Sequence, residues 1–157
     1  MIDFFTWGTA NGRKVSIMLE ECALRYRVHR VDIGRDEQFR KEFIAINPNS
    51  KIPAIVDLAG PDGKPIKMFE SGAILVYLAG KAGRFLPRTV RGKYEALQWL
   101  MFQMSSVGPM FGQTRHFLHV ASDRTPYAIE RYTKETRRLY GVLDRRLAEL
   151  QFLATEY

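Results

Sequence analysis

The chain has 157 residues, 46% hydrophobic and 26% charged, which is the composition of a globular protein with an apolar core in one domain or two small ones. No apolar run approaches the ~20 residues that cross a bilayer and no signal-peptide pattern opens the chain, so we expect a cytoplasmic protein with no membrane partner. The formal net charge of +7 would suit nucleic acid, but basic and acidic residues are interleaved without a recognition motif, so we expect no nucleic-acid partner.

The first element is a predicted buried strand, IDFFT, at residues 2–6, which leads directly into a helix. In that helix Val15, Met18, Leu19 and Cys22 recur at the i, i+3, i+4, i+7 spacing of a core face. Cys22 is the single cysteine, which excludes an internal disulfide, a cysteine zinc cluster and a CxxC pair, so redox chemistry would need a sulfur from elsewhere. Its place on the core face favours packing over reactivity.

The corner between this strand and this helix, TWGTANGRK, is a candidate site. Unpaired N–H groups at a helix start favour negative charge, and enzymes often place a reactive group there. Here the corner offers only the hydroxyl of Thr9 and the amide of Asn11, without a Cys, His, Tyr or carboxylate. The sequence therefore predicts a site whose nucleophile, if it has one, does not come from this corner.

The rest of the first half alternates between strands and helices. The predicted elements are a strand, a short helix, two strands and a helix, at residues 25–33, 37–46, 51–58, 65–69 and 71–83. We expect His29 to face solvent or a sheet edge, Ser71 to be the N-cap of the last helix and Gly83 to lie near its end. The element order is thus β-α-β-α-β-β-α.

From about residue 88 the pattern is helical only. Pro109 predicts a break in the helices, because proline disrupts a helix interior. Thr125 and Pro126 predict the cap and first turn of a long final helix. Its apolar stripe comprises Tyr132, Thr136, Leu139, Leu143 and Leu147. We interpret its densest basic residues as a solvated face, with attraction for a small anion as the alternative; they are Arg137, Arg138, Arg145 and Arg146.

This order of elements favours a thioredoxin-like half followed by an all-α half, and the segment NSKIPAIVD strengthens that prediction. Pro53 at the start of a strand removes a ladder donor, and the Ile52–Pro53 bond is a candidate for the cis form. The backbone of Ile52 would then be free to pair with an extended peptide as a short antiparallel strand. Simple protection of a sheet edge by Pro53 is the alternative.

The segment MFESGAI places a carboxylate and a hydroxyl at a helix start. Together they could recognise an amino acid, with Glu70 taking the ammonium while Ser71 and free N–H groups take the carboxylate. Helix capping by Ser71 beside a solvated Glu70 explains the same pair. Combined with the corner and Pro53, the first interpretation describes an extended peptide with an amino-acid-like end and a sulfur pointing at the first helix, which is the description of glutathione.

At this point the sequence resembles the glutathione transferase family, and within it the bacterial Nu-class branch. The matching segments span essentially the whole chain in the right order: TxNGRKVSIMLEE, VDIGRDEQF, INPNSKIPAIVD, FESGAILVYLA, LQWLMFQMSSVGPMFGQ and PYAIERYTKETRRLYGVLDRRL. The resemblance implies a thioredoxin-like βαβαββα domain at residues 1–84, an incomplete all-α domain of glutathione transferase type at residues 88–157, and a homodimer.

The resemblance also implies the site. It assigns Thr9 and Asn11 to the glutathione sulfur, Ile52 to main-chain pairing with the cysteinyl unit, and Glu70 and Ser71 to the γ-glutamyl end. Further positions that approach glutathione or its disulfide are Gln38, Lys51, Pro53 and Arg131. Glutathione is then a co-substrate, and no metal is implied.

Two departures from the branch stand out. Ala10 replaces its usual proline, so the loop loses a rigid φ, a change typically worth ~0.4 to 1 kcal/mol. The chain also stops at Tyr157, where the family would begin another helix, so we expect either a fragment or a truncated, impaired relative that is prone to association through exposed apolar surface.

The implied mechanism explains the corner, because the ligand supplies the nucleophile. A thiol has an unperturbed pKa of ~8.5, and hydrogen bonds from Thr9 and Asn11 at a helix N-terminus would favour the thiolate. Two glutathiones could then reduce a small disulfide in two exchange steps. Conjugation of electrophiles is one alternative, and a non-catalytic regulatory module of the same fold is another.

Overall fold

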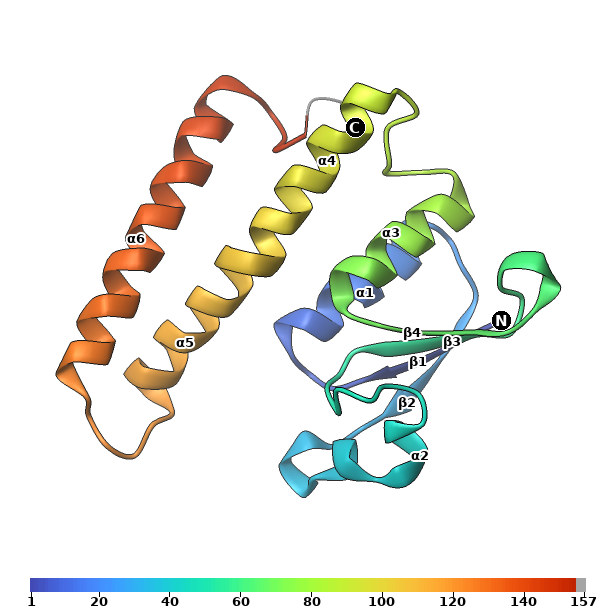
Figure 1. Ribbon diagram of the computed structural model, residues 1–157, viewed down its shortest axis with the longest axis horizontal. Helices are drawn as coiled ribbons and strands as arrows, with labels where there is room; N and C mark the ends of the chain where they lie inside the picture. The colour runs from blue at the N-terminus through green and yellow to red at the C-terminus, as the bar shows by residue number, and fades with distance from the viewer. Residues whose placement is uncertain (155–157) are drawn as a thin grey trace. The chain divides into compact units, whose positions relative to one another are not determined.

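The computed structural model describes residues 1–154 and divides between Phe85 and Leu86 into two compact units (Figure 1). The helices and strands of the first unit are β1 (Ile2–Thr6), α1 (Ala10–Glu21), β2 (Tyr26–Arg30), α2 (Lys41–Ile44), β3 (Ala54–Asp57), β4 (Ile66–Phe69) and α3 (Ser71–Ala82). The predicted helix at residues 37–46 is split into a 3₁₀ turn, Glu37–Phe39, and the short α2. Arg40 separates the two pieces because its backbone is extended.

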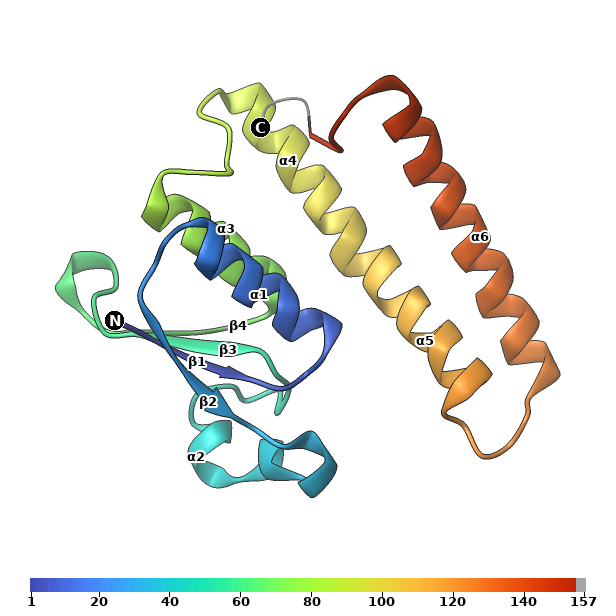
Figure 2. The same ribbon diagram turned by 180° about the vertical axis from the view of Figure 1, so that it is seen from behind.

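The four strands form one mixed sheet in the order β2-β1-β3-β4. β1 pairs in parallel with β2 and antiparallel with β3, and β3 pairs antiparallel with β4. The parallel pair needs a crossover, which α1 supplies. Figures 1 and 2 show α1 and α3 on one face of the sheet and α2 on the other. This is the predicted βαβαββα, thioredoxin-like arrangement.

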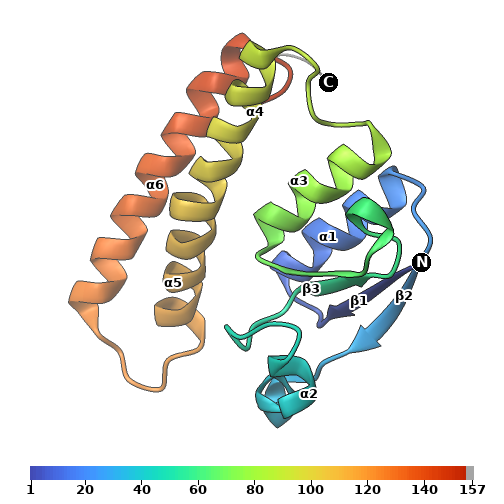
Figure 3. The ribbon, with the colours of Figure 1, turned by 45° about the vertical axis from the view of Figure 1, so that its right-hand side comes forward.

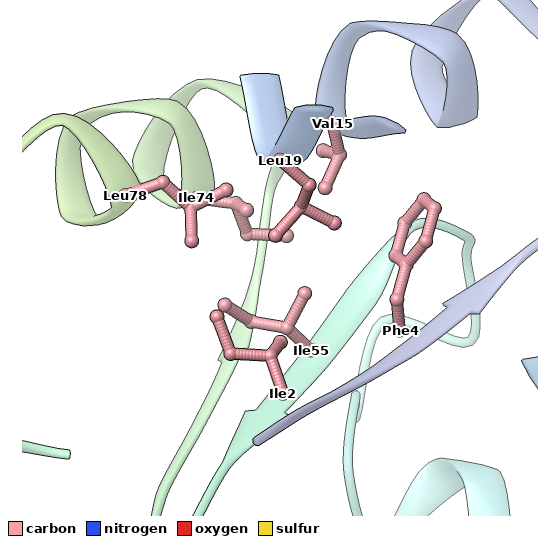
Figure 4. Close-up of a cluster of buried hydrophobic side chains, with 7 residues drawn as sticks. All are labelled: Ile2, Phe4, Val15, Leu19, Ile55, Ile74 and Leu78. Carbon is pink, nitrogen blue, oxygen red and sulfur yellow. The ribbon is translucent and has the colours of Figure 1, made fainter. Parts of the chain in front are cut away.

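The main core of this unit lies between the sheet and the two longer helices. Figure 4 shows seven buried side chains from both layers converging there, Ile2, Phe4, Val15, Leu19, Ile55, Ile74 and Leu78. Burying each large apolar side chain contributes about 1.5–3 kcal/mol relative to exposure. As predicted, α1 turns Val15 and Leu19 into this core, and Cys22 at its end is 8% exposed.

A smaller cluster on the opposite face of the sheet consists of Val31, Phe43 and Ala54, with Phe5, Ile46 and Ile52 packed against it. His29 belongs to the same face, where its ring stacks on Phe5 and its Nε2 lies 2.8 Å from Asp3 Oδ1. The cluster anchors the segment between α2 and β3, because both Phe43 and Ile52 pack in it. That segment carries part of the candidate site.

A buried carboxylate ends β3. Asp57 is fully buried and accepts hydrogen bonds from Tyr77 Oη at 2.6 Å and from its neighbour Ala59 N–H at 3.0 Å, while Lys81 Nζ lies 2.8 Å away. Burial opposes ionisation of this carboxyl, but these partners outweigh it and hold its pKa below the usual value. The same burial and the Asp57 carboxylate raise the pKa of Tyr77. The network ties α3 to the sheet.

The second unit contains α4 (Val90–Phe102), α5 (Gly108–His119) and α6 (Pro126–Glu149). The break predicted at Pro109 is wrong, because a π-helical turn, Gln103–Val107, joins α4 to α5 (Figure 3). Gly108 N–H reaches back to Gln103 C=O in this wide turn, and Pro109 then falls in the first turn of α5, where its missing N–H costs little. Proline therefore changes the helix here without ending it.

The final helix begins at Pro126 as predicted, although the hydroxyl of Thr125 makes no capping bond. Within its stripe Leu139 is fully buried, whereas Leu147 is 49% exposed. The solvated-face interpretation is wrong for Arg146: its guanidinium pairs with Glu95, donates to Leu153 C=O at 2.9 Å and lies over the Trp99 ring. Glu95 and Trp99 are distant in sequence, so local charge density could not reveal these two partners. None of the helices within residues 1–154 is long and apolar enough to span a membrane.

Candidate active site

The corner between β1 and α1 is built around Thr9. This residue is the N-cap of α1, with extended backbone, and its Oγ1 accepts a hydrogen bond from Gly12 N–H at 3.2 Å. Because the hydroxyl accepts in that bond, its own O–H remains available as a donor. Asn11 lies exposed in the first turn of the same helix. Two side-chain donors therefore stand at one helix N-terminus, where an anion is favoured.

Gly12 sets the approach of this helix to the sheet. A Cβ at this position would lie 2.3 Å from Thr6 Oγ1 and 2.7 Å from Trp7 C=O, closer than real contacts allow. Any larger residue would therefore push the start of α1 away from the end of β1. The glycine thus allows the helix to begin directly beside the strand, which places Thr9 and Asn11 at the corner.

The segment before β3 is held by a buried amide. Asn47 is 2% exposed, and its Nδ2 donates to Lys51 C=O at 2.5 Å while its Oδ1 accepts from Asn49 N–H at 2.8 Å. The Ile52–Pro53 bond is cis, as the sequence predicted. The strand pairing of β3 begins only at Ala54, so Ile52 lies outside the ladder. The backbone of Ile52, which we predicted to pair with an extended peptide, therefore lies next to β3 without pairing with a neighbouring strand.

Glu70 forms the corner between β4 and α3. Its backbone is at φ 65° and ψ 113°, a conformation that side-chain-bearing residues rarely adopt. The prediction that Ser71 is the N-cap is wrong, because Glu70 occupies that position and Ser71 is the first helical residue, 3% exposed. Serine is favoured at a helix cap by local preference, but here the cap lies one residue earlier, at Glu70, which contacts the distant Asn49. Glu70 itself is exposed, and its Oε1 accepts from Asn49 Nδ2 at 3.4 Å.

Lys14 adds a charge that the sequence analysis missed. It lies half-buried on α1, one turn beyond Asn11. Burial lowers the pKa of its amine, and the nearby Glu70 carboxylate opposes that shift. The helix spacing of three residues from Asn11 was the available signal, because residues at i and i+3 share a face. Lys14 therefore links the first corner electrostatically to the second.

The remaining predicted site residues are spread more widely. Gln38 lies in the 3₁₀ turn before α2, where its Nε2 donates to Asp36 at 3.3 Å and its buried Oε1 has no partner within the described part of the chain. Lys51 is exposed and Pro53 is buried beside Ile52. Arg131 belongs to the second unit, on α6, in a groove of about 760 Å³ that Tyr127, Lys134 and Arg138 also line.

The first unit thus brings most of the predicted residues into three neighbouring structural features: the α1 corner, the Asn47–Ile52 segment and the Glu70 corner. Lys14 and Asn49 connect them. Over residues 1–154 there is no group of three His, Cys, Asp or Glu side chains able to hold a metal ion. Burial, the largest influence, raises the pKa of the Cys22 thiol, which disfavours a thiolate there. Fold and site together define a thioredoxin-fold protein followed by a helical unit, with a polar corner that holds Thr9 and Asn11 and no cysteine.

Comparison with known proteins gives the family. A model of the glutathione S-transferase N-terminal domain matches residues 10–81. The disulfide-bond oxidoreductase YfcG of Escherichia coli is 52% identical over 157 residues, which cover 99% of this chain and 73% of that protein. This chain belongs to the glutathione transferase family.

Two solved structures extend the comparison. A glutathione transferase from Pseudomonas putida, with one glutathione disulfide bound per subunit, is 48% identical with a TM-score of 0.96, over 99% of this chain and 69% of that one. A glutathione transferase from Burkholderia graminis, with two glutathione molecules bound per subunit, is also 48% identical with a TM-score of 0.96, over 99% and 66%. The chain therefore spans about two thirds to three quarters of the length of these proteins.

Proposed function

We propose that this protein is a glutathione-dependent disulfide-bond reductase. The observation that carries the proposal is Thr9, whose hydroxyl caps α1 as an acceptor and so keeps a donor for a sulfur at the helix N-terminus. The only cysteine, Cys22, is buried with a raised thiol pKa, so the reacting sulfur has to come from the ligand. A similar protein is named a disulfide-bond oxidoreductase, which supports the same reaction class.

The first unit, residues 1–84 in the domain division we propose, binds glutathione. Thr9 and Asn11 donate to the sulfur, the backbone of Ile52 beside Pro53 pairs with the cysteinyl unit, and Glu70 takes the α-ammonium. Ser71 and the amides at the start of α3 take the γ-glutamyl carboxylate. Auxiliary contacts come from Gln38, Lys51 and, in the helical domain of residues 88–157, Arg131. Two observations support this assignment: the Glu70 carboxylate is exposed, and the backbone of Ile52 lies outside the paired residues of β3.

The reaction is two thiol–disulfide exchanges. The bound thiolate attacks one sulfur of the substrate disulfide, forming a mixed disulfide and releasing the other sulfur as a thiolate. A second glutathione thiolate attacks the glutathione sulfur of the mixed disulfide, giving oxidised glutathione and a second released thiolate. The two protons lost by the glutathiones end on the two product thiols. The net change is one disulfide and two glutathiones converted to two thiols and one glutathione disulfide.

This proposal includes a setting as well as a reaction. We also propose that the protein is cytoplasmic, because reduced glutathione is abundant enough there to drive the exchange. We further propose that it is a homodimer of the Nu class. It needs neither nucleic acid nor a membrane as a partner. Arg131 of α6 then serves an anionic ligand such as glutathione disulfide, whereas Arg138 in the same groove already pairs with Glu135 at 2.7 Å.

The test combines binding with turnover on the whole chain. Calorimetry is expected to show binding of glutathione and its disulfide and much weaker binding of the tripeptide with an ordinary α-glutamyl link. Incubation with a small model disulfide is expected to yield one glutathione disulfide per substrate reduced. Conjugation of an electrophile without disulfide reduction would make the protein a transferase instead. Folded protein that binds glutathione but performs neither reaction would make it a regulatory module.

A further inference from the structure

The strained backbone of Glu70 needs an explanation beyond a solvated carboxylate. A residue with a side chain at positive φ costs about 1–3 kcal/mol and persists only where its surroundings hold it. Glu70 has φ 65° and ψ 113°, and its side chain makes no capping bond to α3. A glutamate that merely faced water would gain nothing from this conformation. Something outside the local sequence therefore determines where its carboxylate points.

Within residues 1–154 a neutral side chain, that of Asn49, donates to this carboxylate. Asn49 Nδ2 donates to Glu70 Oε1 at 3.4 Å, across 21 positions of sequence. Asn49 is itself fixed, because its backbone N–H donates to the side chain of Asn47 at 2.8 Å. Asn47 is buried and also binds Lys51 C=O. One buried amide thus anchors both the turn that holds Glu70 and the backbone that leads to Ile52.

The carboxylate keeps capacity for a ligand. An ionised carboxylate has about four lone-pair sites, and Asn49 uses one of them. The Lys14 amine of α1 also interacts with this carboxylate and offsets part of its charge. A neutral amide donor has a further property: it orients the carboxylate without cancelling its charge, as an arginine at that place would do.

We propose that Asn49 is a positioning residue that orients Glu70 to receive the α-ammonium of the γ-glutamyl group. The inference rests on the proposed function and deepens it. Through Asn47 and Asn49, the carboxylate of Glu70 and the backbone of Ile52 are held at a fixed spacing. A γ-glutamyl link places the ammonium two methylene groups farther from the peptide bond than an α-glutamyl link does. A fixed spacing therefore selects between the two isomers.

The test compares Asn49→Ala with the unaltered protein for two ligands, glutathione and glutaryl-cysteinyl-glycine, which lacks only the α-amino group. Asn49 is exposed and its backbone bond to Asn47 survives the substitution, so the variant keeps its fold. Loss of one hydrogen bond to Glu70 is expected to weaken glutathione binding about threefold to tenfold. Affinity for glutaryl-cysteinyl-glycine is expected to stay unchanged. Lys64→Ala, an exposed substitution between β3 and β4, is the matched control for both ligands.

The outcomes separate three cases. Equal weakening for both ligands, or none for glutathione, overturns the role of Asn49. Equal binding of both ligands by the unaltered protein shows that Glu70 does not read the ammonium, which also overturns the inference but leaves disulfide reduction standing. No glutathione binding at all refutes the proposed function. In a Glu70→Gln background Asn49→Ala is expected to have no further effect on glutathione affinity, whereas a merely structural role would weaken it by the same factor as before.

Discussion

Thr9 has two roles in the proposed mechanism, and one substitution separates them. As N-cap of α1 it accepts from Gly12 N–H at 3.2 Å, and in the proposed site it donates a hydrogen bond to the glutathione thiolate. Aspartate caps a helix at least as well as threonine, but its carboxylate has no proton to donate at neutral pH and repels an anion. Thr9→Asp therefore keeps the cap and destroys the donor. Thr9→Ala removes both, and Thr9→Ser keeps both.

The magnitudes follow from these contacts. Loss of the cap in Thr9→Ala is expected to lower the free energy of unfolding by about 0.5–2 kcal/mol, whereas Thr9→Asp is expected to match or exceed the unaltered protein. A hydrogen bond to a charged group contributes ~1.5–3 kcal/mol, so loss of the donor predicts turnover lower by about 10- to 150-fold. The bound thiol pKa is expected to rise by about one unit or more, since each unit represents ~1.4 kcal/mol.

The assay measures thermal unfolding, the thiolate absorbance of bound glutathione against pH, and disulfide turnover at saturating glutathione. We expect stability in the order Asp and Thr above Ala, and turnover in the order Thr and Ser above Ala above Asp. Because the two orders differ, a purely structural role cannot produce both. Turnover that simply follows stability, with Thr9→Asp fully active, would show that Thr9 is a cap and nothing more.

The other predictions concern the buried groups of the first unit. Tyr77→Phe removes a 2.6 Å bond to the fully buried Asp57 carboxylate and is expected to lower the free energy of unfolding by about 1.5–3 kcal/mol in a denaturant titration. Tyr94→Phe, a change in an exposed side chain of α4, is the control and is expected to leave that free energy unchanged. Since the folded pKa of Asp57 lies below its unfolded value of ~3.9, its contribution is complete above that pH and is lost as pH falls through the folded pKa. The stability gap between the unaltered protein and Asp57→Asn should therefore shrink on acidification, and a widening gap would contradict this account. Cys22→Ala is expected to keep disulfide turnover, because the thiol is buried with a raised pKa; a folded but inactive variant would mean that the protein uses its own sulfur.

Elements whose causes are local were predictable from the sequence. The core face of α1 follows from helical spacing alone, and Val15 and Leu19 are indeed fully buried. The proline at the start of β3 made the Ile52–Pro53 bond a candidate for the cis form, and the bond is cis. The break at Pro109 was wrong for an instructive reason, because the rule that proline disrupts a helix assumes α geometry throughout. A π turn widens the backbone just before the proline, and no residue type in the segment QMSSV predicts such a turn.

Features whose causes lie far along the chain were not predictable. Arg146 belongs to a run of arginines that resembles a solvated face, yet its partner Glu95 is 51 residues away. Asn49 follows a proline and precedes Ser50, so its neighbours indicate an ordinary turn. Only in the folded chain does its amide reach Glu70. Pairwise contacts of this kind leave no trace in composition or periodicity, since neither measures distance between elements.

Glu70 shows how such long-range contacts bear on function. Local preferences favour Ser71 as the helix cap, which would leave residue 70 in ordinary extended backbone and turn its side chain elsewhere. The folded chain instead moves the cap by one residue and accepts a positive φ, at a cost of about 1–3 kcal/mol. In exchange the carboxylate lies within reach of Asn49 and in the field of Lys14. Because relaxing the corner would remove these contacts, Glu70→Gly, which tolerates the backbone but lacks the carboxylate, should retain stability while glutathione affinity falls. A variant that lost both equally would place the origin of the strain in folding rather than in ligand binding.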